Sequence, residues 1–313
     1  MKYFFIVFFN ILLLVNLKAG TGVDLLSGGT GVRAFALGGA YTALADSAAG
    51  AAYNPAGLGQ IKHSEIMSSS FSMFDGDLSK LSFDFVFPID FGVIGLNFLQ
   101  EAINDIPLVK DNNNQPEIYG SFDNTSRCFN LSFAKAIYWD ITYFGINLKY
   151  FTESLSGATA TGWGVDLGFI QYLPNNIKIS LVARNILPVN LSWNTGHTDT
   201  IPLNIVTGVS YWQLLFGRVL LVSLDMDLVR SQKPTYVKYG LEYYVWGFPK
   251  KGSYKDIKSQ IKRNPGLILR MGKNEFEELT FGIGFVYQEF KLDYAFQDHD
   301  LGNSSQIAIG YSF

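Results

Sequence analysis

The three histidines are the first residues whose type could do acid–base or metal chemistry. His197 is followed by Asp199, His299 stands between two aspartates, and His63 precedes the first predicted strand. All three lie in or beside predicted loops, where histidines flanked by carboxylates are usually solvated. No serine, histidine and acid form a recognisable catalytic signature, although a triad meeting on one rim of the fold remains the alternative. We therefore expect no enzyme activity, no metal site and no cofactor.

A second set of candidate residues occupies every other position of strand-like segments. Phe144, Ile146 and Leu148 alternate with Asn147 and Lys149, which gives one apolar and one polar face. Ionisable residues that face a cavity inside a membrane mark a pathway by default, and ion pairing across the wall is the equal alternative. The charged positions on such polar faces are Asp84, Lys149, Asp166, Asp225, Asp227, Lys238, Glu242 and Asp293.

About fourteen segments of the chain carry this alternation. They span roughly 64–74, 78–88, 91–100, 127–137, 140–153, 161–172, 176–185, 202–212, 216–228, 234–246, 264–272, 279–287, 290–297 and 304–313. The apolar faces are large and aromatic, and we expect lipid contact for Phe83, Phe85, Phe144, Ile146, Trp163, Val165, Ile283, Phe285, Ile309 and Tyr311. The last segment closes on Phe313, which resembles the last strand of bacterial outer-membrane barrels.

The composition fits a membrane barrel better than a soluble domain. Mean hydropathy is +0.14, 15% of residues are aromatic and only 16% are charged. Beyond the N-terminus no apolar run approaches the about 20 residues that a transmembrane helix needs. Alternating strands closed into a cylinder expose apolar surface to lipid without exposing backbone edges. The sequence therefore predicts an all-β fold over 63–313: a transmembrane antiparallel β-barrel of about fourteen strands in contact with outer-membrane lipid. A net charge of −3 argues against a nucleic-acid partner.

The N-terminus resembles an export signal. Lys2 is followed by an apolar run over 3–15 and by small residues at Ala19 and Gly20, which suit cleavage. The run is too short to span a bilayer. We interpret 1–20 as a signal peptide and expect the mature protein in the bacterial outer membrane.

Residues 21–62 do not alternate and are rich in glycine and alanine. A helical stretch and the turn Asn54-Pro55-Ala56-Gly57 precede the first strand. Because fourteen strands enclose more space than side chains fill, this segment is predicted to form a helical hatch or plug inside the barrel. We expect Asn54 and Pro55 near the periplasmic mouth, against the wall of the first strand. Capping of a turn by Asn54 is the alternative to a gating role.

The same segment carries a family resemblance. The motif residues are Arg33-Ala34, Leu37-Gly38-Gly39-Ala40, Ala43-Leu44-Ala45-Asp46 and Asn54-Pro55-Ala56-Gly57-Leu58, with Gly162-Trp163-Gly164-Val165-Asp166 and Leu292-Asp293-Tyr294 further along. In these residues the chain resembles the PorV/PorQ family and the UPF0164 outer-membrane proteins, and more distantly the FadL superfamily of long-chain fatty acid transporters. The resemblance implies a fourteen-stranded barrel whose hatch contains the Asn-Pro-Ala motif.

The resemblance also implies competing functions. The FadL likeness implies passage of hydrophobic small molecules across the outer membrane. The PorV likeness implies a barrel that works with secretion components and handles exported protein cargo. A structural barrel without cargo is the third possibility. We favour transport of hydrophobic compounds slightly over the secretion role.

Connection lengths predict which end of the barrel faces the periplasm. If both termini are periplasmic, even-numbered connections should be short, and most are. The long stretches 101–126 and 186–201 then become outer loops. One even-numbered connection, 247–263, is long and basic, with partner-contact candidates at Lys250, Lys251, Lys255 and Lys258. It is either a solvated amphipathic insertion or a docking surface for a partner or lipid head groups.

Overall fold

The computed structural model describes residues 31–112, 115–138, 140–229, 236–246, 266–274, 278–299 and 302–313. The predicted signal peptide, the basic insertion with its four lysines and the first part of the hatch, 21–30, lie outside the described residues.

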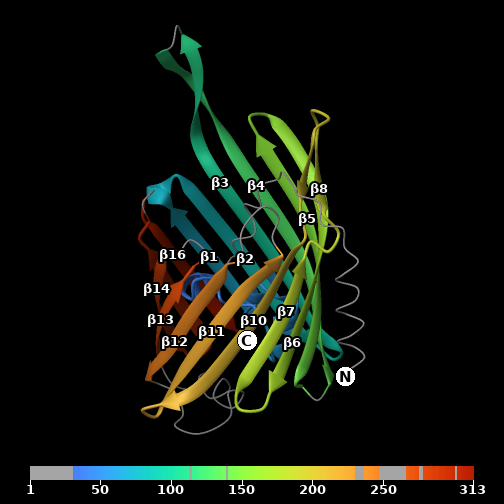
Figure 1. The fold of residues 1–313 in the computed structure, drawn as a ribbon, viewed down its shortest axis with the longest axis vertical. Helices are drawn as coiled ribbons and strands as arrows, with labels where there is room; N and C mark the ends of the chain where they lie inside the picture. The colour runs from blue at the N-terminus through green and yellow to red at the C-terminus, as the bar shows by residue number, and fades with distance from the viewer. Residues whose placement is uncertain are drawn as a thin grey trace.

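Within the described ranges, fourteen antiparallel strands close into one barrel (Figure 1). They are β1 (Glu65–Met73), β2 (Leu78–Ile89), β3 (Gly92–Asn112), β4 (Gln115–Tyr138), β5 (Thr142–Leu155), β6 (Ala158–Leu173), β7 (Ile177–Arg184), β10 (Asn204–Leu215), β11 (Arg218–Val229), β12 (Val237–Trp246), β13 (Gly266–Lys273), β14 (Leu279–Tyr287), β15 (Phe290–Gln297) and β16 (Ser304–Ser312). Consecutive barrel strands pair, and β1 pairs with β16 to close the ring, with Glu65 opposite Ser312. The prediction of an all-β barrel with about fourteen strands is confirmed.

The two faces of the wall follow the predicted alternation. Phe83 is 49% exposed whereas Asp84 is 1% exposed, because successive side chains point to opposite faces. Of the ten residues expected to contact lipid, Phe85, Phe144 and Val165 are half-buried and the other seven are exposed. The wall therefore presents apolar side chains outward and polar side chains inward.

Two stretches predicted as loops contain strands instead. Strands β3 and β4 continue as a twisted two-stranded hairpin well beyond the barrel rim, so 101–126 is mostly strand (Figure 1). The register shifts between Ile103 and Ile106, beside Asp105 with a positive φ of 56°. This irregularity breaks the alternation on which sequence reasoning relied. The stretch 186–201 contains a second hairpin, β8 (Val189–Trp193) and β9 (Thr198–Ile201), which pairs with β6.

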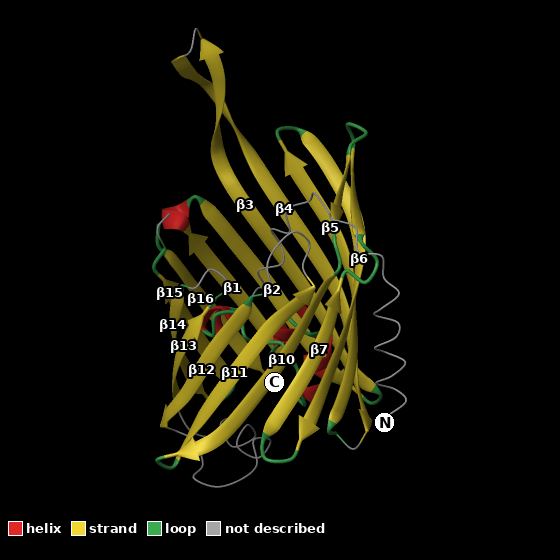
Figure 2. Ribbon diagram, viewed as in Figure 1, coloured by secondary structure: helices red, strands yellow, loops and turns green. Residues whose placement is uncertain are grey.

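Residues 31–61, called the inner segment from here on, lie inside the barrel (Figure 2). The predicted helical stretch is mostly turns: it holds one short α-helix, α2 (Val32–Ala36), and two 3-10 turns, η2 (Ala48–Ala52) and η3 (Pro55–Gln60). The helix stops because Gly38 and Gly39 adopt positive φ of 64° and 81°, a conformation that glycine tolerates best. A third 3-10 turn, η4 (Phe74–Gly76), joins β1 to β2. No helix in the described part of the chain is long and apolar enough to cross a membrane.

The barrel has two distinguishable ends. The terminal end is where β1 begins and β16 finishes, and the hairpin end is where the β3–β4 hairpin projects (Figure 1). The two-residue turns between β2 and β3, β10 and β11, and β14 and β15 lie at the terminal end. The described flanks of the basic insertion, Trp246 and Gly266, also lie there, since β12 ends and β13 begins at that end.

Candidate functional site

The barrel wall has glycine at the positions where it contacts the inner segment. A Cβ added to Gly168 would lie 2.1 Å from the Asn54 Oδ1 atom, and one added to Gly272 would lie 2.1 Å from the Gly38 nitrogen. Such distances are far below van der Waals contact, so only glycine fits. The wall glycines whose Cβ would strike the inner segment are Gly95, Gly145, Gly168, Gly208, Gly240, Gly272 and Gly282, on seven different strands. The inner segment is therefore built into the barrel around much of its circumference.

Two asparagine–aspartate pairs bind the backbone of turn η2. On β3, the Asn97 amide donates to the Ala48 carbonyl at 3.1 Å and to the Asp84 carboxylate on β2 at 2.7 Å. On β5, the Asn147 amide donates to the carbonyl of Ala51 at 2.9 Å and to the carboxylate of Asp166 on β6 at 3.1 Å. In each pair the aspartate orients the amide that holds the inner segment.

Asp225 on β11 binds the part of the inner segment that follows α2. Its Oδ2 atom accepts from the backbone amides of Tyr41 and Thr42, both at 2.9 Å. The Thr42 hydroxyl donates to the Asp225 Oδ1 atom at 2.9 Å. These three charge-assisted bonds hold the backbone of the inner segment to the carboxylate.

Asn54 and Pro55 sit against a different wall from the one expected. The Asn54 side chain accepts from the Ala56 amide at 3.0 Å and donates to the Thr42 carbonyl at 2.8 Å. Both residues pack on Gly145 of β5 and Gly168 of β6 rather than on the first strand. The expectation about the first strand is thus wrong. The capping interpretation of Asn54 matches this geometry, since its oxygen caps η3 and Pro55 occupies the first position of the turn.

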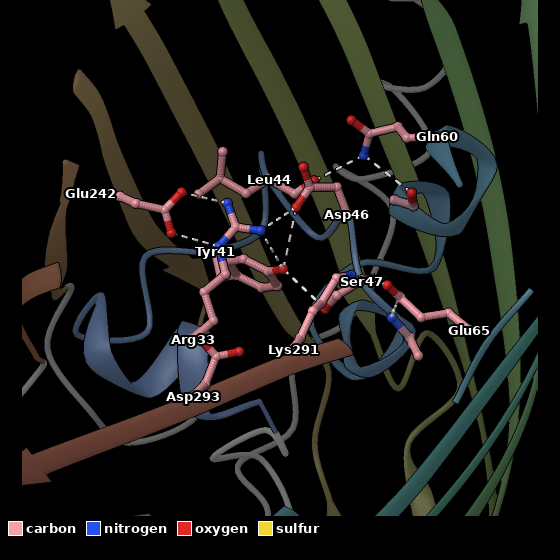
Figure 3. A network of polar contacts seen from close by, with 12 residues as sticks. Arg33, Tyr41, Leu44, Asp46, Ser47, Gln60, Glu65, Glu242, Lys291 and Asp293 are labelled. Atoms are coloured by element: carbon pink, nitrogen blue, oxygen red, sulfur yellow. Dashed lines mark hydrogen bonds and ion pairs between the residues drawn. The ribbon is translucent and has the colours of Figure 1, made fainter. Parts of the chain in front are cut away.

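A buried ion network fixes α2 to strands β12, β13 and β15. Figure 3 shows the part of this network in which Arg33 binds Glu242 and Asp46. The Arg33 guanidinium binds both oxygens of Glu242, at 2.7 and 2.8 Å, and also binds Asp46 at 2.6 Å. The Arg270 guanidinium binds the same Glu242 carboxylate at 2.7 Å and Asp293 at 2.5 Å. Glu242 is fully buried, so its charge depends on these two guanidinium groups.

The protonation states of the inner segment follow from this network. Burial by itself lowers the pKa of the Arg33 guanidinium. The carboxylates of Glu242 and Asp46 raise this pKa, and their combined effect exceeds that of burial, so the pKa of Arg33 lies well above its usual value. Burial raises the pKa of the Tyr41 phenol above its usual range. Arg33 therefore stays charged, and Tyr41 stays a neutral hydroxyl beside Asp46 and Ser47.

The remaining predicted lumen residues form ion pairs within the wall. Lys149 contacts Asp166 at 2.6 Å and the Asn185 side chain at 2.5 Å. Lys238 contacts Asp227 at 3.4 Å, and both line the interior. These contacts are ion pairs, which is one of the two interpretations that the sequence left open for these positions.

Several residues of the site were not singled out from the sequence. Arg33 and Asn97 were matched only as part of the family resemblance, and Asn147 only as part of that resemblance and as a polar-face residue of its strand. Their signal is visible afterwards: each asparagine stands on the polar face of a strand whose neighbour carries an aspartate on the same face. Arg270 interrupts the predicted segment 264–272 with a single inward cation. The role of these residues depends on which strands are paired, and the sequence alone does not show those pairings.

The inner segment separates two cavities. The terminal cavity, about 250 Å³, is lined by Arg33, Tyr41, Gln60, Tyr143, Tyr172 and Ile268, among others. The hairpin cavity, about 180 Å³, is lined by Phe35, Tyr53, Phe71, Arg184, Asn204 and Gln306, among others. Arg33 and Ala34 of α2 line the terminal cavity, whereas Phe35 of the same helix lines the hairpin cavity. A molecule that passed along the barrel axis would meet the inner segment between the cavities.

The histidines lie apart from this site or at its edge. His197 contacts Asp199 at 3.2 Å near the β8–β9 turn, and His299 contacts Glu278 at 2.8 Å at the hairpin end. In the described ranges no three histidine, cysteine or acidic side chains are grouped so that they could hold a metal ion.

Comparisons with known proteins support the fold assignment. No protein-family model matches the chain, and no curated protein matches it. Among solved structures, the toluene transporter TbuX of Ralstonia pickettii aligns with a TM-score of 0.58 and 12% identity, over 93% of this chain and 100% of its own. A FadL homologue of Pseudomonas aeruginosa aligns with a TM-score of 0.55 and 10% identity, over 94% and 100%. A deletion mutant of TodX, described as a monoaromatic hydrocarbon channel, gives 0.54 and 15% identity, over 93% and 99%.

These neighbours define a class of fold: the chain has the barrel architecture of FadL-like outer-membrane transporters. The expected likeness to the FadL superfamily is thus confirmed at the level of fold. The finer likeness to PorV/PorQ and UPF0164 proteins stays a prediction from the N-terminal motif. The structural neighbours are transporters or channels rather than enzymes.

Proposed function

We propose that this chain is an outer-membrane barrel that passes hydrophobic small molecules across the bacterial outer membrane. The observation that carries the proposal is a closed barrel whose lumen is divided into two cavities by a built-in segment. An outer face of exposed apolar side chains supports a membrane location, as does the fold of the neighbours. In this proposal 1–20 is the signal peptide, and 21–62 is the hatch.

The terminal end is then the periplasmic end. Except for the connection between β12 and β13, its turns are short, as periplasmic turns are in outer-membrane barrels, and the long hairpins β3–β4 and β8–β9 extend from the other end. Hydrophobic molecules would enter from the hairpin end and leave through the terminal cavity. Passage requires the inner segment to shift, because in the described conformation it stands between the cavities.

Uptake by intact cells tests the proposal. Gram-negative cells that produce the full chain should accumulate labelled toluene at least about threefold faster than cells with an empty vector. Toluene crosses phospholipid readily, so the measurement depends on an intact lipopolysaccharide leaflet. A hydrophilic sugar supplied in parallel should show no change, which separates selective passage from membrane damage. Equal toluene uptake in both strains would contradict the proposal.

A PorV-like role in secretion is the second candidate, and one feature favours it. The projecting β3–β4 hairpin exposes Val109, Ile118 and Tyr119 by 53%, 69% and 65%, beyond the barrel rim. Val109 and Ile118 are directly opposite each other on the hairpin and form one exposed apolar patch, and such patches suit contact with a protein. If exported proteins co-purify with the wild-type chain but not with a variant carrying serine at these three positions, the secretion role gains over transport.

A further inference from the structure

The hairpin cavity contains polar groups that the described part of the chain leaves without partners. Three buried side-chain atoms that make neither a hydrogen bond nor an ion pair belong to residues lining it: Arg184 Nε, Asn204 Oδ1 and Gln306 Oε1. Asn204 is 8% exposed and Gln306 is 3% exposed. A buried polar atom without a partner destabilises the fold, because it has lost its hydrogen bonds to water. Three of them around one cavity therefore point to a ligand, because native proteins rarely tolerate such groups.

Arg184 and Asn204 stand next to each other on the wall. They are register partners on β7 and β10, and their side chains share the lumen face. Directly opposite residues on an antiparallel pair place their Cβ atoms about 4.5–5.5 Å apart. The Arg184 Nη2 atom already donates to the Tyr53 carbonyl at 3.1 Å, which leaves its Nε–H group available. The wall thus carries one donor and one acceptor at paired positions beside the cavity, and a ligand would reach these buried atoms by turning the two side chains toward it.

The charges around this pair favour a neutral ligand. No carboxylate lies within ion-pair distance of Arg184 among the described residues, so a cation placed against Arg184 would be repelled. The carboxylates of Asp227 and Glu278, which line the same cavity, already contact Lys238 and His299. An anion bound to Arg184 would face the unpartnered Asn204 oxygen, a second repulsive contact. A neutral hydroxyl group satisfies both sides: its oxygen accepts from Arg184 Nε–H, and its proton is donated to Asn204 Oδ1.

The rest of the lining is suited to an apolar body. Phe35 and Tyr53 of the inner segment, together with Phe71 and Phe74, contribute aromatic side chains to the same cavity. Tyr53 is 5% exposed and its ring meets that of Tyr41 edge-on at 5.3 Å, which fixes its position. Apolar walls with a few placed polar groups are typical of small-molecule sites.

We propose that the hairpin cavity is a binding site for a small neutral hydroxyl compound with an apolar body, such as a phenol or an alcohol, held by Arg184 and Asn204. This inference rests on the proposed function and narrows it, because hydroxyl-bearing compounds would be selected over plain hydrocarbons. A site built around a hydroxyl rejects an analogue that lacks it, since the analogue leaves buried polar groups unpaired.

Phenol and toluene form a matched pair of probes, since they differ only by a hydroxyl in place of a methyl group. Equilibrium binding to the purified full-length chain in detergent should show about tenfold tighter binding of phenol. Asn204→Leu keeps the size of the side chain and removes the acceptor, and Arg184→Met keeps the stem and removes the donor. Each should weaken phenol binding about tenfold and change toluene binding by less than about twofold. Asn190→Leu, at an exposed position of β8, is the control and should retain the preference.

Equal affinity of the wild type for the two probes, or no binding of phenol, would overturn the proposal, whether or not the variants fold. A phenol preference that survives in Asn204→Leu and Arg184→Met would overturn it as well. Binding in detergent does not depend on transport. A chain that prefers phenol yet gives no toluene or phenol uptake in cells would leave this site standing and contradict the proposed function alone.

Discussion

Glu242 occupies the centre of the polar network that holds the inner segment in place. Its carboxylate receives two guanidinium groups, and the Tyr244 hydroxyl donates to it at 2.6 Å. Five charged groups meet here: the two cations Arg33 and Arg270, and three carboxylates. Removing one partner from a buried ion network lowers the stability of the fold by more than the intact network raises it, because the remaining charges are buried without a counter-charge.

Glu242→Gln is therefore expected to destabilise the barrel by about 3–5 kcal/mol. Gln keeps the shape of the side chain but leaves Arg33 with Asp46 alone and Arg270 with Asp293 alone. The loss can be measured as a lower midpoint of urea unfolding, followed by the heat-modifiable gel mobility of the purified chain.

Glu117→Gln provides the matched control, since Glu117 is exposed on the β3–β4 hairpin. Its effect should stay within about 0.5 kcal/mol, as is usual for surface positions. If both variants unfold at the same urea concentration, the network does not stabilise the inner segment.

At the scale of elements, the inner segment behaves as a set of turns held by the wall rather than as a self-sufficient helix. Its only α-helix has five residues, too short to be stable alone. Its backbone instead depends on side chains of β3, β5, β11 and β14, through Asn97, Asn147, Asp225 and Thr280. The barrel strands pair with each other without help from this segment.

Deletion of residues 31–60 should consequently leave a folded barrel with a larger single-channel conductance. The strand pairings remain, whereas the barrier between the two cavities is lost. Planar-bilayer recordings of the full chain and the deletion variant measure the difference. The control is deletion of 106–121, which shortens the β3–β4 hairpin outside the barrel and should leave conductance unchanged. Equal conductance of all three chains would contradict the hatch role.

The sequence predicted the barrel strands well and the interior poorly. Period-two alternation is a direct consequence of a wall with two different faces, so all fourteen strands could be found from it. The β3–β4 hairpin was missed because it has water on both faces, and Pro107 and a register shift interrupt it. The inner segment's contacts could not be found either. Gly145 and Gly168 allow the inner segment to approach the wall closely, but a glycine in the sequence does not indicate which residue will pack against it.

At the scale of the whole molecule, the exposed apolar wall sets the environment of the protein. The outward faces of β2, β5, β14 and β16 expose large residues such as Phe83, Leu148, Ile283 and Ile309, by 39% or more. The strands between them expose Ile66, Leu96, Leu131 and Leu292 in the same way, so the apolar residues form a continuous band. A soluble protein rarely exposes so large an apolar surface, and a bilayer makes it favourable.

Leu148→Arg tests this arrangement, because Leu148 lies near the middle of β5, opposite Leu131 and Val165 on the outer face. An arginine at the bilayer midplane costs about 2–4 kcal/mol, whereas one near an interface costs about 0–1 kcal/mol. We expect the larger loss when the variant is unfolded from phospholipid vesicles. Ile118→Arg, on the hairpin outside the barrel, should cost almost nothing, since its side chain is 69% exposed and expected to be in water. A loss for Ile118→Arg as large as that for Leu148→Arg would mean that the membrane also covers the hairpin. No loss for either variant would mean that the apolar band does not face lipid, and the transport proposal would fall with it.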